Sequence, residues 1–201
     1  MVSDPIRIEG DADIAASHTR IHGHFWVFGY GSLMWNPGFR YEESRHAVLP
    51  GFHRSFCIRS TMYRGTPEQP GLVLGIDSGG ECNGMAFRID EAHREEVLAY
   101  LFEREMRTHV YTPTWVTIRL EGPAAETAPA LTFVVKRGHS QFCCMTDDEI
   151  VQVIASSAGT NGSNYEYLEN TVHALHDLGV PDPAMDELHD RVAARIDIAP
   201  R

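Results

Sequence analysis

The sequence predicts an α+β protein in which a mixed or antiparallel sheet curls into a small barrel with flanking helices. Strand-like segments dominate the first half and helix-like segments the end, without regular strand–helix–strand alternation. The chain has 201 residues, 43% of them hydrophobic and 22% charged, which is ordinary for a globular protein. At roughly 150 residues per domain, this length favours a single domain, expected over residues 24–201.

Residues 1–23 are polar and show no hydrophobic periodicity, so we expect a flexible N-terminal arm. A signal peptide has an apolar core that follows a basic start, and this arm shows no such pattern. No stretch approaches the roughly 20 apolar residues that span a bilayer. The four cysteines lack C-x-x-C spacing, which favours free thiols. These features together predict a cytoplasmic protein.

The charge balance narrows the expected partners. There are 17 basic and 28 acidic residues, giving a net charge of −11 with histidine neutral. Such a surface repels nucleic-acid phosphates and disfavours docking on anionic membranes. We therefore expect no nucleic-acid or membrane partner. A small-molecule substrate agrees with this charge, and we expect a monomer or homodimer.

The expected strands begin with the apolar run Phe25–Phe28, which is typical of a buried strand. A second strand spans Ala47 to Ile58, with Phe52, Phe56 and Ile58 on one parity. The remaining expected strands are 72–76 and 85–89, joined by a turn at Gly79-Gly80, and then 115–120 and 131–135, separated by an exposed loop over 121–130.

Helices are expected wherever a capping residue precedes an amphipathic segment. The first expected helix starts at Asp90 and runs to about Met106, and the second starts at Thr146 with a capping box to Glu149. The third starts near Ser163 and ends at Leu178, before Gly179. A shorter fourth helix is expected to start at Asp182-Pro183.

The first expected helix carries a carboxylate on its apolar face. Glu105 lies four residues after Leu101 and seven after Leu98, whereas Glu103 points to the opposite side. Burial of a carboxylate raises its pKa, which suits a general base near neutral pH. The alternative is that Glu105 is exposed at a frayed helix end, or pairs with Arg104 or Arg107. The stripe itself comprises Val97, Leu98, Leu101 and Phe102.

A glycine-containing loop, Gly29-Tyr30-Gly31-Ser32, follows the first strand. The third glycine of a dinucleotide fingerprint is replaced by Met34, and no Gly-Lys-Ser/Thr sequence of a P-loop is present. The loop could present backbone N–H groups to an anion or a developing oxyanion, or could be a plain turn. Ser32 lacks the G-x-S-x-G context of a serine nucleophile.

Two further groups allow a functional or a structural interpretation. His173 and His176 lie three residues apart on a helix and could form half of a metal site. The H-E-x-x-H motif is absent, however, so the two histidines more simply flank the apolar face. Arg54, Arg59 and Arg64 could line a site for an anionic ligand or could offset the acidic surface.

Several motifs in this order resemble those of the ChaC-type γ-glutamylcyclotransferase family, in its glutathione-degrading branch. The resemblance covers about Phe25 to Val192. The matching segments are Val27–Trp35, Pro50–Phe52 with Arg54, Arg64–Pro67, Pro70-Gly71, Tyr100-Leu101, Arg104-Glu105, and a C-terminal group of Gly159, Gly162, Asn164, Glu166, Tyr167 and Leu168.

The resemblance implies a lyase that converts a γ-glutamyl peptide into 5-oxoproline and a free amine. Glutathione would give 5-oxoproline and Cys-Gly. The substrate's own α-amine attacks its γ-amide carbonyl, and no cofactor or metal takes part. Glu105 corresponds to the family's catalytic glutamate, as general base and acid. The loop of Tyr30, Gly31, Ser32 and Leu33 is implied to bind the glutamyl group through backbone N–H groups.

Four other side chains are implied substrate-binding residues. These are Tyr111 and Tyr167 as hydroxyl donors, Arg64 for the distal carboxylate, and Asn164 from the C-terminal motif. The glycine-free segment after Glu105 and the tyrosine at position 63 depart from the family pattern. A cyclotransferase for another γ-glutamyl amine or amino acid therefore stays open, as does a non-catalytic glutamyl-binding module on the same fold.

Overall fold

The computed structural model describes residues 6–7, 23–122, 126–180 and 182–198. Within the span expected to form one domain, the chain forms two compact units, and each is described by itself. Unit 1 comprises residues 1–54 and 76–136, and unit 2 comprises 55–75 and 137–201. The elements are β1 (Ile6–Arg7), β2 (Phe25–Gly29), β3 (Glu43–Ser60), β4 (Gly71–Ile89), the 3₁₀ turn η1 (Glu91–His93), α2 (Arg94–Glu105), β5 (Tyr111–Leu120), β6 (Glu126–Val135), α3 (Asp147–Ser156), β7 (Ala158–Gly159), β8 (Gly162–Ser163), α4 (Asn164–Asp177) and α5 (Pro183–Ile198).

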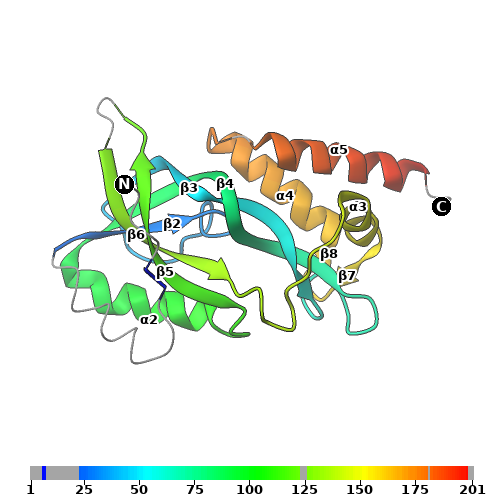
Figure 1. The fold of residues 1–201 in the computed structure, drawn as a ribbon, viewed down its shortest axis with the longest axis horizontal. Helices are drawn as coiled ribbons and strands as arrows, with labels where there is room; N and C mark the ends of the chain where they lie inside the picture. The colour runs from blue at the N-terminus through cyan, green and yellow to red at the C-terminus, as the bar shows by residue number, and fades with distance from the viewer. Residues whose placement is uncertain (1–5, 8–22, 123–125, 181, 199–201) are drawn as a thin grey trace. The chain divides into compact units, whose positions relative to one another are not determined.

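Unit 1 is built on a closed mixed sheet (Figure 1), which confirms the expected fold class. The strand order is β1-β5-β3-β4-β2-β6, and an additional β5–β6 pairing closes the ring. β2 is antiparallel to β4 and parallel to β6. The first part of β3, to Arg54, and the last part of β4, from Ile76, belong to this unit. A closed ring leaves no unpaired edge among its own strands.

The barrel core comes from alternate positions of its strands, as the period of two requires. Trp26 and Phe28 of β2 point into the core, whereas Phe25 lies under the guanidinium of Arg94 from α2, 5.3 Å from its ring centre. The core consists of Trp26, Phe28, Tyr30, Ala47, Leu49, Phe52, Ile76, Cys82, Ala86, Val116, Ile118, Leu120, Ala128, Ala130 and Val134.

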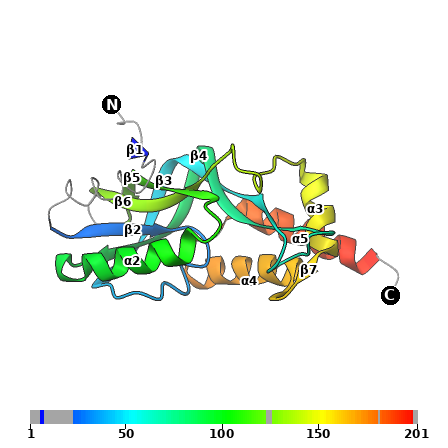
Figure 2. The same cartoon turned by 90° about the horizontal axis from the view of Figure 1, so that it is seen from below.

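Helix α2 lies along the outside of the barrel, beneath β2 in the view of Figure 2. Asp90 does act as a cap, but its side chain accepts a hydrogen bond from Ala92 in a 3₁₀ turn, and α2 begins only at Arg94. At the other end of the helix, Phe102 meets Phe133 of β6 edge to face, with ring centres 6.2 Å apart. This packing places the last turn of α2 against the barrel.

Two sequence predictions within the strands were wrong. β4 is continuous from Gly71 to Ile89, so Gly79 and Gly80 do not end a strand; they take positive φ values (110° and 69°) inside it. The expected loop over 121–130 is shorter, because β6 already begins at Glu126 and pairs with β5 from there. Pairing with a neighbouring strand overrides weak local propensity in both places.

Most of the expected arm lies outside the described residues. Within its described part, Ile6–Arg7 pairs with β5 opposite Trp115 and Thr114. No helix in the described part of the chain is long and apolar enough to cross a membrane.

Unit 2 contains α3, α4, α5 and the β7–β8 hairpin. The capping box at Thr146 is confirmed, with the Thr146 N–H donating to Glu149 Oε2 at 2.7 Å. Ser163 caps α4, and Gly179 ends that segment with a φ of 69°. The expected short fourth helix is wrong in length, because α5 spans 16 residues.

Packing against α3 and α4 stabilises α5, with Met185 and Val192 buried. Arg191 of α5 donates to Asp148 of α3 at 2.7 Å and lies 3.6 Å from Asp147.

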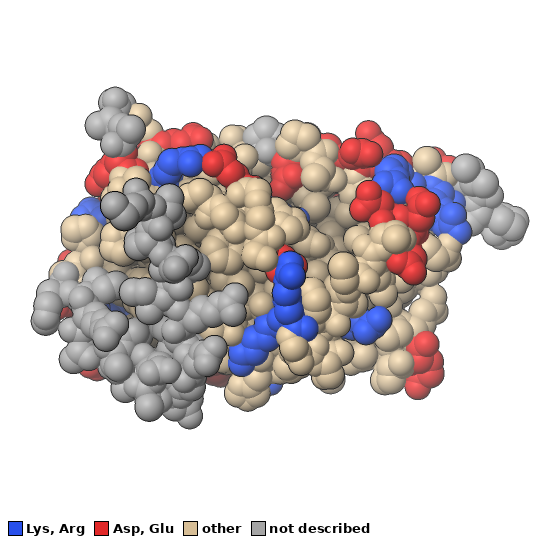
Figure 3. All heavy atoms as spheres, viewed as in Figure 1, with Lys and Arg blue, Asp and Glu red and all other residues tan. Residues whose placement is uncertain are grey.

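Figure 3 shows acidic side chains spread in small groups with basic ones between them on the face in view. The net negative charge is therefore distributed on this face rather than gathered in one patch.

Candidate active site

The loop after β2 is held rigidly at its first residue. The Tyr30 hydroxyl donates to the Phe133 carbonyl at 2.8 Å inside the barrel. The Tyr30 carbonyl accepts from Arg54 Nε at 2.6 Å, and Arg54 also donates to the Asn83 carbonyl at 2.6 Å. Arg54 is only 5% exposed, so it supports the loop from β3. Arg54 therefore does not offset the acidic surface, and its contacts give it a role in supporting the loop that the sequence did not predict.

The rest of this loop forms a turn that leaves N–H donors available. Met34 N–H donates to the Gly31 carbonyl at 2.8 Å, and Asn36 N–H donates to the Ser32 carbonyl at 2.9 Å. Among the residues that the structure describes, the N–H groups of Gly31, Ser32 and Leu33 have no acceptor. Three fixed donors in a row are suited to an anion or oxyanion.

Glu105, the last residue of α2, lies on the buried face that the sequence predicted. Its side chain is 17% exposed, whereas Glu103 is exposed. Its Oε1 lies 3.2 Å from Arg104 Nε, so the pairing with Arg104 that the sequence left open as an alternative is present, in a buried setting. Burial raises the pKa of the Glu105 carboxyl, and the Arg104 charge and hydrogen bond partly oppose that rise. The raised pKa is the property expected of a general base.

Arg104 connects Glu105 to the loop. Its NH2 donates to Ser32 Oγ at 2.9 Å, and its NH1 donates to the Asn36 carbonyl at 2.7 Å and to the Tyr100 hydroxyl at 3.0 Å. From the sequence, Arg104 was a possible ion-pair partner of Glu105 and part of a family motif. Its contacts with Ser32 and Asn36 span about 70 positions of sequence, and local spacing carries no signal of them.

Tyr111 lies in the same unit, at the first residue of β5 opposite Val135, and is half-buried. Its role as a hydroxyl donor to the substrate stays a prediction.

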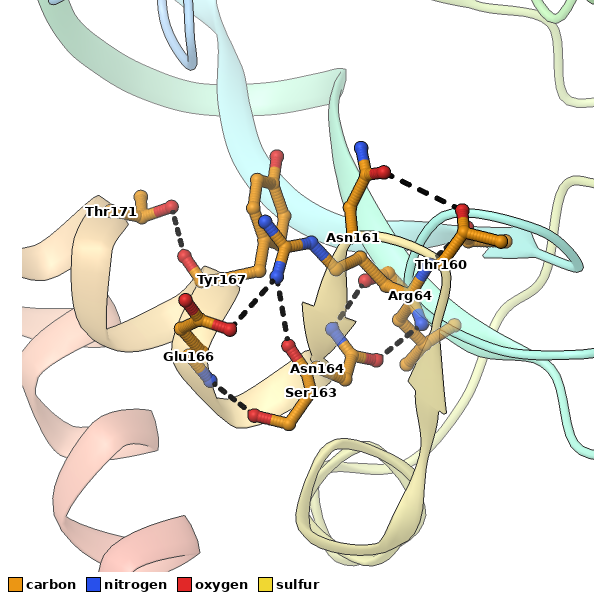
Figure 4. Close-up of polar contacts among 10 residues, drawn as sticks. Arg64, Thr160, Asn161, Ser163, Asn164, Glu166, Tyr167 and Thr171 are labelled. Carbon is orange, nitrogen blue, oxygen red and sulfur yellow. Dashed lines mark hydrogen bonds and ion pairs between the residues drawn. The ribbon is translucent and has the colours of Figure 1, made fainter.

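In unit 2, Arg64 and Tyr167 form one cluster with the start of α4 (Figure 4). Arg64 donates to the Ser163 carbonyl at 3.0 Å and lies 3.6 Å from Glu166. Its guanidinium lies over the Tyr167 ring, 5.2 Å from the ring centre, and Phe56 meets the same ring edge to face. The structure thus brings Arg64 and Tyr167 together, and their contact with a substrate stays a prediction.

Asn164 is fully buried at the first residue of α4. Its Oδ1 accepts from the Leu72 N–H at 2.6 Å, and its Nδ2 donates to the Leu72 carbonyl at 2.7 Å (Figure 4). The side chain therefore substitutes for a neighbouring strand and ties α4 to β4. Its expected contact with a substrate also stays a prediction.

One of the two histidines weighed as metal ligands has an aspartate neighbour. His176 Nε2 lies 2.8 Å from Asp186 Oδ1, linking α4 to α5. Within the described ranges, no group of three or more His, Cys, Asp or Glu side chains is arranged to hold a metal ion.

Comparison with known proteins identifies the family. The profile of the ChaC-like protein family matches residues 25–195. A glutathione-specific γ-glutamylcyclotransferase from Escherichia coli is 38% identical over 167 residues, which cover 83% of this chain and 71% of that protein. The enzyme of the same name from Schizosaccharomyces pombe is 32% identical, with 83% and 89% covered.

Solved structures agree in fold. The crystal structure of a yeast γ-glutamylcyclotransferase specific to glutathione superposes with a TM-score of 0.76 at 26% identity, covering 86% of this chain and 97% of that one. With a matching family profile over most of its length and relatives above 30% identity, this chain belongs to the ChaC-like family of γ-glutamylcyclotransferases.

Proposed function

We propose that the protein cleaves glutathione to 5-oxoproline and Cys-Gly, with Glu105 as the general base and acid. The observation that carries this proposal is the buried carboxylate of Glu105 held, through Arg104, beside a loop with three N–H donors that have no acceptor among the described residues. The names of the relatives supply the substrate. We place the reaction in the cytoplasm, in a monomer or homodimer.

The reaction moves two protons and exchanges two bonds. The substrate's α-nitrogen arrives as an ammonium, loses one proton to Glu105, and attacks the γ-carbonyl carbon to close a five-membered ring. The bond from that carbon to the cysteine nitrogen then breaks. In total two protons leave the α-nitrogen and two reach the leaving nitrogen, and one carboxylate carries them in turn. The raised pKa of Glu105 lets it both accept and return a proton near neutral pH.

The protein's other task is to hold a flexible substrate in its ring-closing geometry. Orientation of this kind contributes up to roughly 7–11 kcal/mol to lowering a barrier. The tetrahedral intermediate bears an oxyanion, and each backbone donor aimed at it is worth about 3 kcal/mol. We assign these donors to the N–H groups of Gly31, Ser32 and Leu33, and the glutamyl end to the same loop.

Residues outside this loop are assigned separately. Tyr111 and Tyr167 stay assigned as hydroxyl donors, and Arg64 stays assigned to the substrate's distal carboxylate. We assign Asn164 a positioning role instead, because both atoms of its amide already bind the Leu72 backbone.

The test is product formation by the purified protein treated with a chelator. We expect 5-oxoproline and Cys-Gly from glutathione by mass spectrometry. Glu105→Gln should lower kcat at least tenfold while substrate binding stays measurable, and Glu103→Gln, on the exposed face, is the matched control and should be nearly silent. A Glu105→Gln variant that retains more than a tenth of wild-type kcat contradicts the general-base assignment.

The same assay distinguishes the alternatives. Glutathione, γ-glutamyl-alanine and a γ-glutamyl-amine are offered together, and the ratio of products reports substrate preference. Turnover of only the latter two would move the substrate and keep the reaction. Binding of all three without product would indicate a glutamyl-binding module.

A further inference from the structure

Arg104 contacts both parts of the candidate site in unit 1. The Nε edge of its guanidinium contacts the general base, with Nε 3.2 Å from Glu105 Oε1. The two terminal nitrogens reach the loop after β2, at Ser32 Oγ (2.9 Å) and at the Asn36 carbonyl (2.7 Å). The Arg104 side chain is 21% exposed. Its bond to Ser32 Oγ is partly buried, whereas its bond to the Asn36 carbonyl lies at the surface.

We propose that Arg104 is a positioning residue that locks the glutamyl-binding loop and Glu105 into one fixed arrangement. The proposal rests on the proposed function for its meaning in catalysis. The planar guanidinium has five donors in a rigid fork, so one side chain can fix three acceptors from two elements. A lysine at this position would keep the charge and lose the fork.

The partners of Arg104 show what the lock fixes. Ser32 is flanked by Gly31 and Leu33, so holding its side chain sets the direction of all three N–H donors. The Asn36 carbonyl fixes the far end of the same turn. On the helix side, Tyr100 lies one turn before Arg104 and its hydroxyl accepts from NH1 at 3.0 Å. A displacement of the loop would therefore be transmitted to the carboxylate through one side chain.

The charge of Arg104 has a separate effect on Glu105. The loop Tyr30–Gly38 contains no charged side chain, and in the described part of the chain Arg104 is the charged group that shifts the Glu105 pKa against the effect of burial. Without this charge the pKa of Glu105 rises further. A base with a higher pKa is protonated over a wider range, so the acid limb of the kcat/KM profile moves to higher pH.

The experiment compares Arg104→Gln, Arg104→Lys and the control Arg107→Gln, which changes an exposed arginine just beyond the helix. We expect Arg104→Gln to lower kcat/KM for glutathione at neutral pH by at least about tenfold and to move the acid limb upward. Arg104→Lys should keep the limb near that of the wild type while kcat/KM still falls severalfold. Arg107→Gln should stay within about twofold of the wild type.

A double-mutant cycle isolates the loop contact. Ser32→Ala should lower kcat/KM in the wild type and have little further effect in Arg104→Gln or Arg104→Lys, because the shared contact is already lost or loosened. Additive losses together with an unmoved acid limb in Arg104→Gln would overturn the proposal. Should Arg104→Gln fail to fold, Arg104→Lys with the same cycle decides, and wild-type behaviour there refutes it.

A readout that needs no turnover separates this proposal from the proposed function. The Glu105 carboxyl is titrated by ¹³C NMR, assigned by its loss in Glu105→Gln. Its pKa should be higher in Arg104→Gln than in the wild type and nearly unchanged in Arg107→Gln. If the wild type makes no product but this shift is present, the proposed function fails and the link between Arg104 and Glu105 stands. If product forms, the shift is absent and the losses in the double-mutant cycle are additive, the proposal about Arg104 fails.

Discussion

In unit 2, removal of the Asn164 side chain is expected to lower the free energy of unfolding by an amount that can be worked out from the structure. It is fully buried, and its amide makes two hydrogen bonds to the backbone of Leu72, at 2.6 Å and 2.7 Å. Asn164→Ala removes both partners and leaves a buried N–H and a buried carbonyl of Leu72 unsatisfied. The change tests whether Asn164 acts by holding the protein together or by touching a substrate.

The size of the effect follows from those two groups. Each buried polar group that loses its partner costs about 1–3 kcal/mol, so the pair predicts a loss near 3 kcal/mol of unfolding free energy. For a chain of this size, 1 kcal/mol moves the thermal midpoint by about 2–4 °C. We therefore expect the Tm of Asn164→Ala to fall by roughly 6–12 °C.

The assay combines thermal unfolding, followed by circular dichroism, with kinetics below the midpoint. The matched control is Asn161→Ala, which removes an exposed asparagine from the adjoining hairpin turn and should cost less than about 0.5 kcal/mol. KM for glutathione in Asn164→Ala should stay within about twofold of the wild type. An unchanged Tm with a KM raised tenfold would refute the positioning role and establish Asn164 as a substrate ligand.

Two further changes test the structure of unit 1. Because burial raises the pKa of Glu105, the folded state binds this proton more tightly than the unfolded state does. The unfolding free energy therefore falls as pH rises from about the ordinary pKa of 4.5 through the raised pKa. Glu105→Gln should raise the Tm at pH 7 and flatten this pH dependence, and calorimetry measures both effects. Gly38 has a φ of 73°, and a Cβ there would overlap the Tyr100 hydroxyl, so Gly38→Ala should cost about 1 kcal/mol or more. Gly138→Ala, where a Cβ meets open space, is its control, and equal midpoints for the two would contradict the clash.

Local patterns were enough to predict that helices form in the four expected segments and the face on which Glu105 lies, but not the start of α2 or the length of α5. The capping box at Thr146 and the turn at Gly179 depend on neighbours within a few residues, and both formed as expected. The burial of Glu105 followed from its spacing to Leu98 and Leu101, since the helical period fixes which side chains share a face. The family motifs then supplied the chemistry.

Contacts between distant segments decided the rest of unit 1. Ser32 and Arg104 are 72 positions apart, so no periodicity could have shown that one side chain links the loop to the base. The continuity of β4 through Gly79 and Gly80 likewise depends on pairing with neighbouring strands rather than on the two glycines.

The same division holds in unit 2. The sequence marked Asn164 as part of a motif, but only the tertiary structure showed its amide bound to Leu72, 92 positions away. Sequence by itself determined the residue types, their local conformation and the apolar faces, because those depend on neighbours along the chain. Which polar atoms meet was decided by the tertiary structure, because a hydrogen bond depends on distances of about 3 Å that only packing sets.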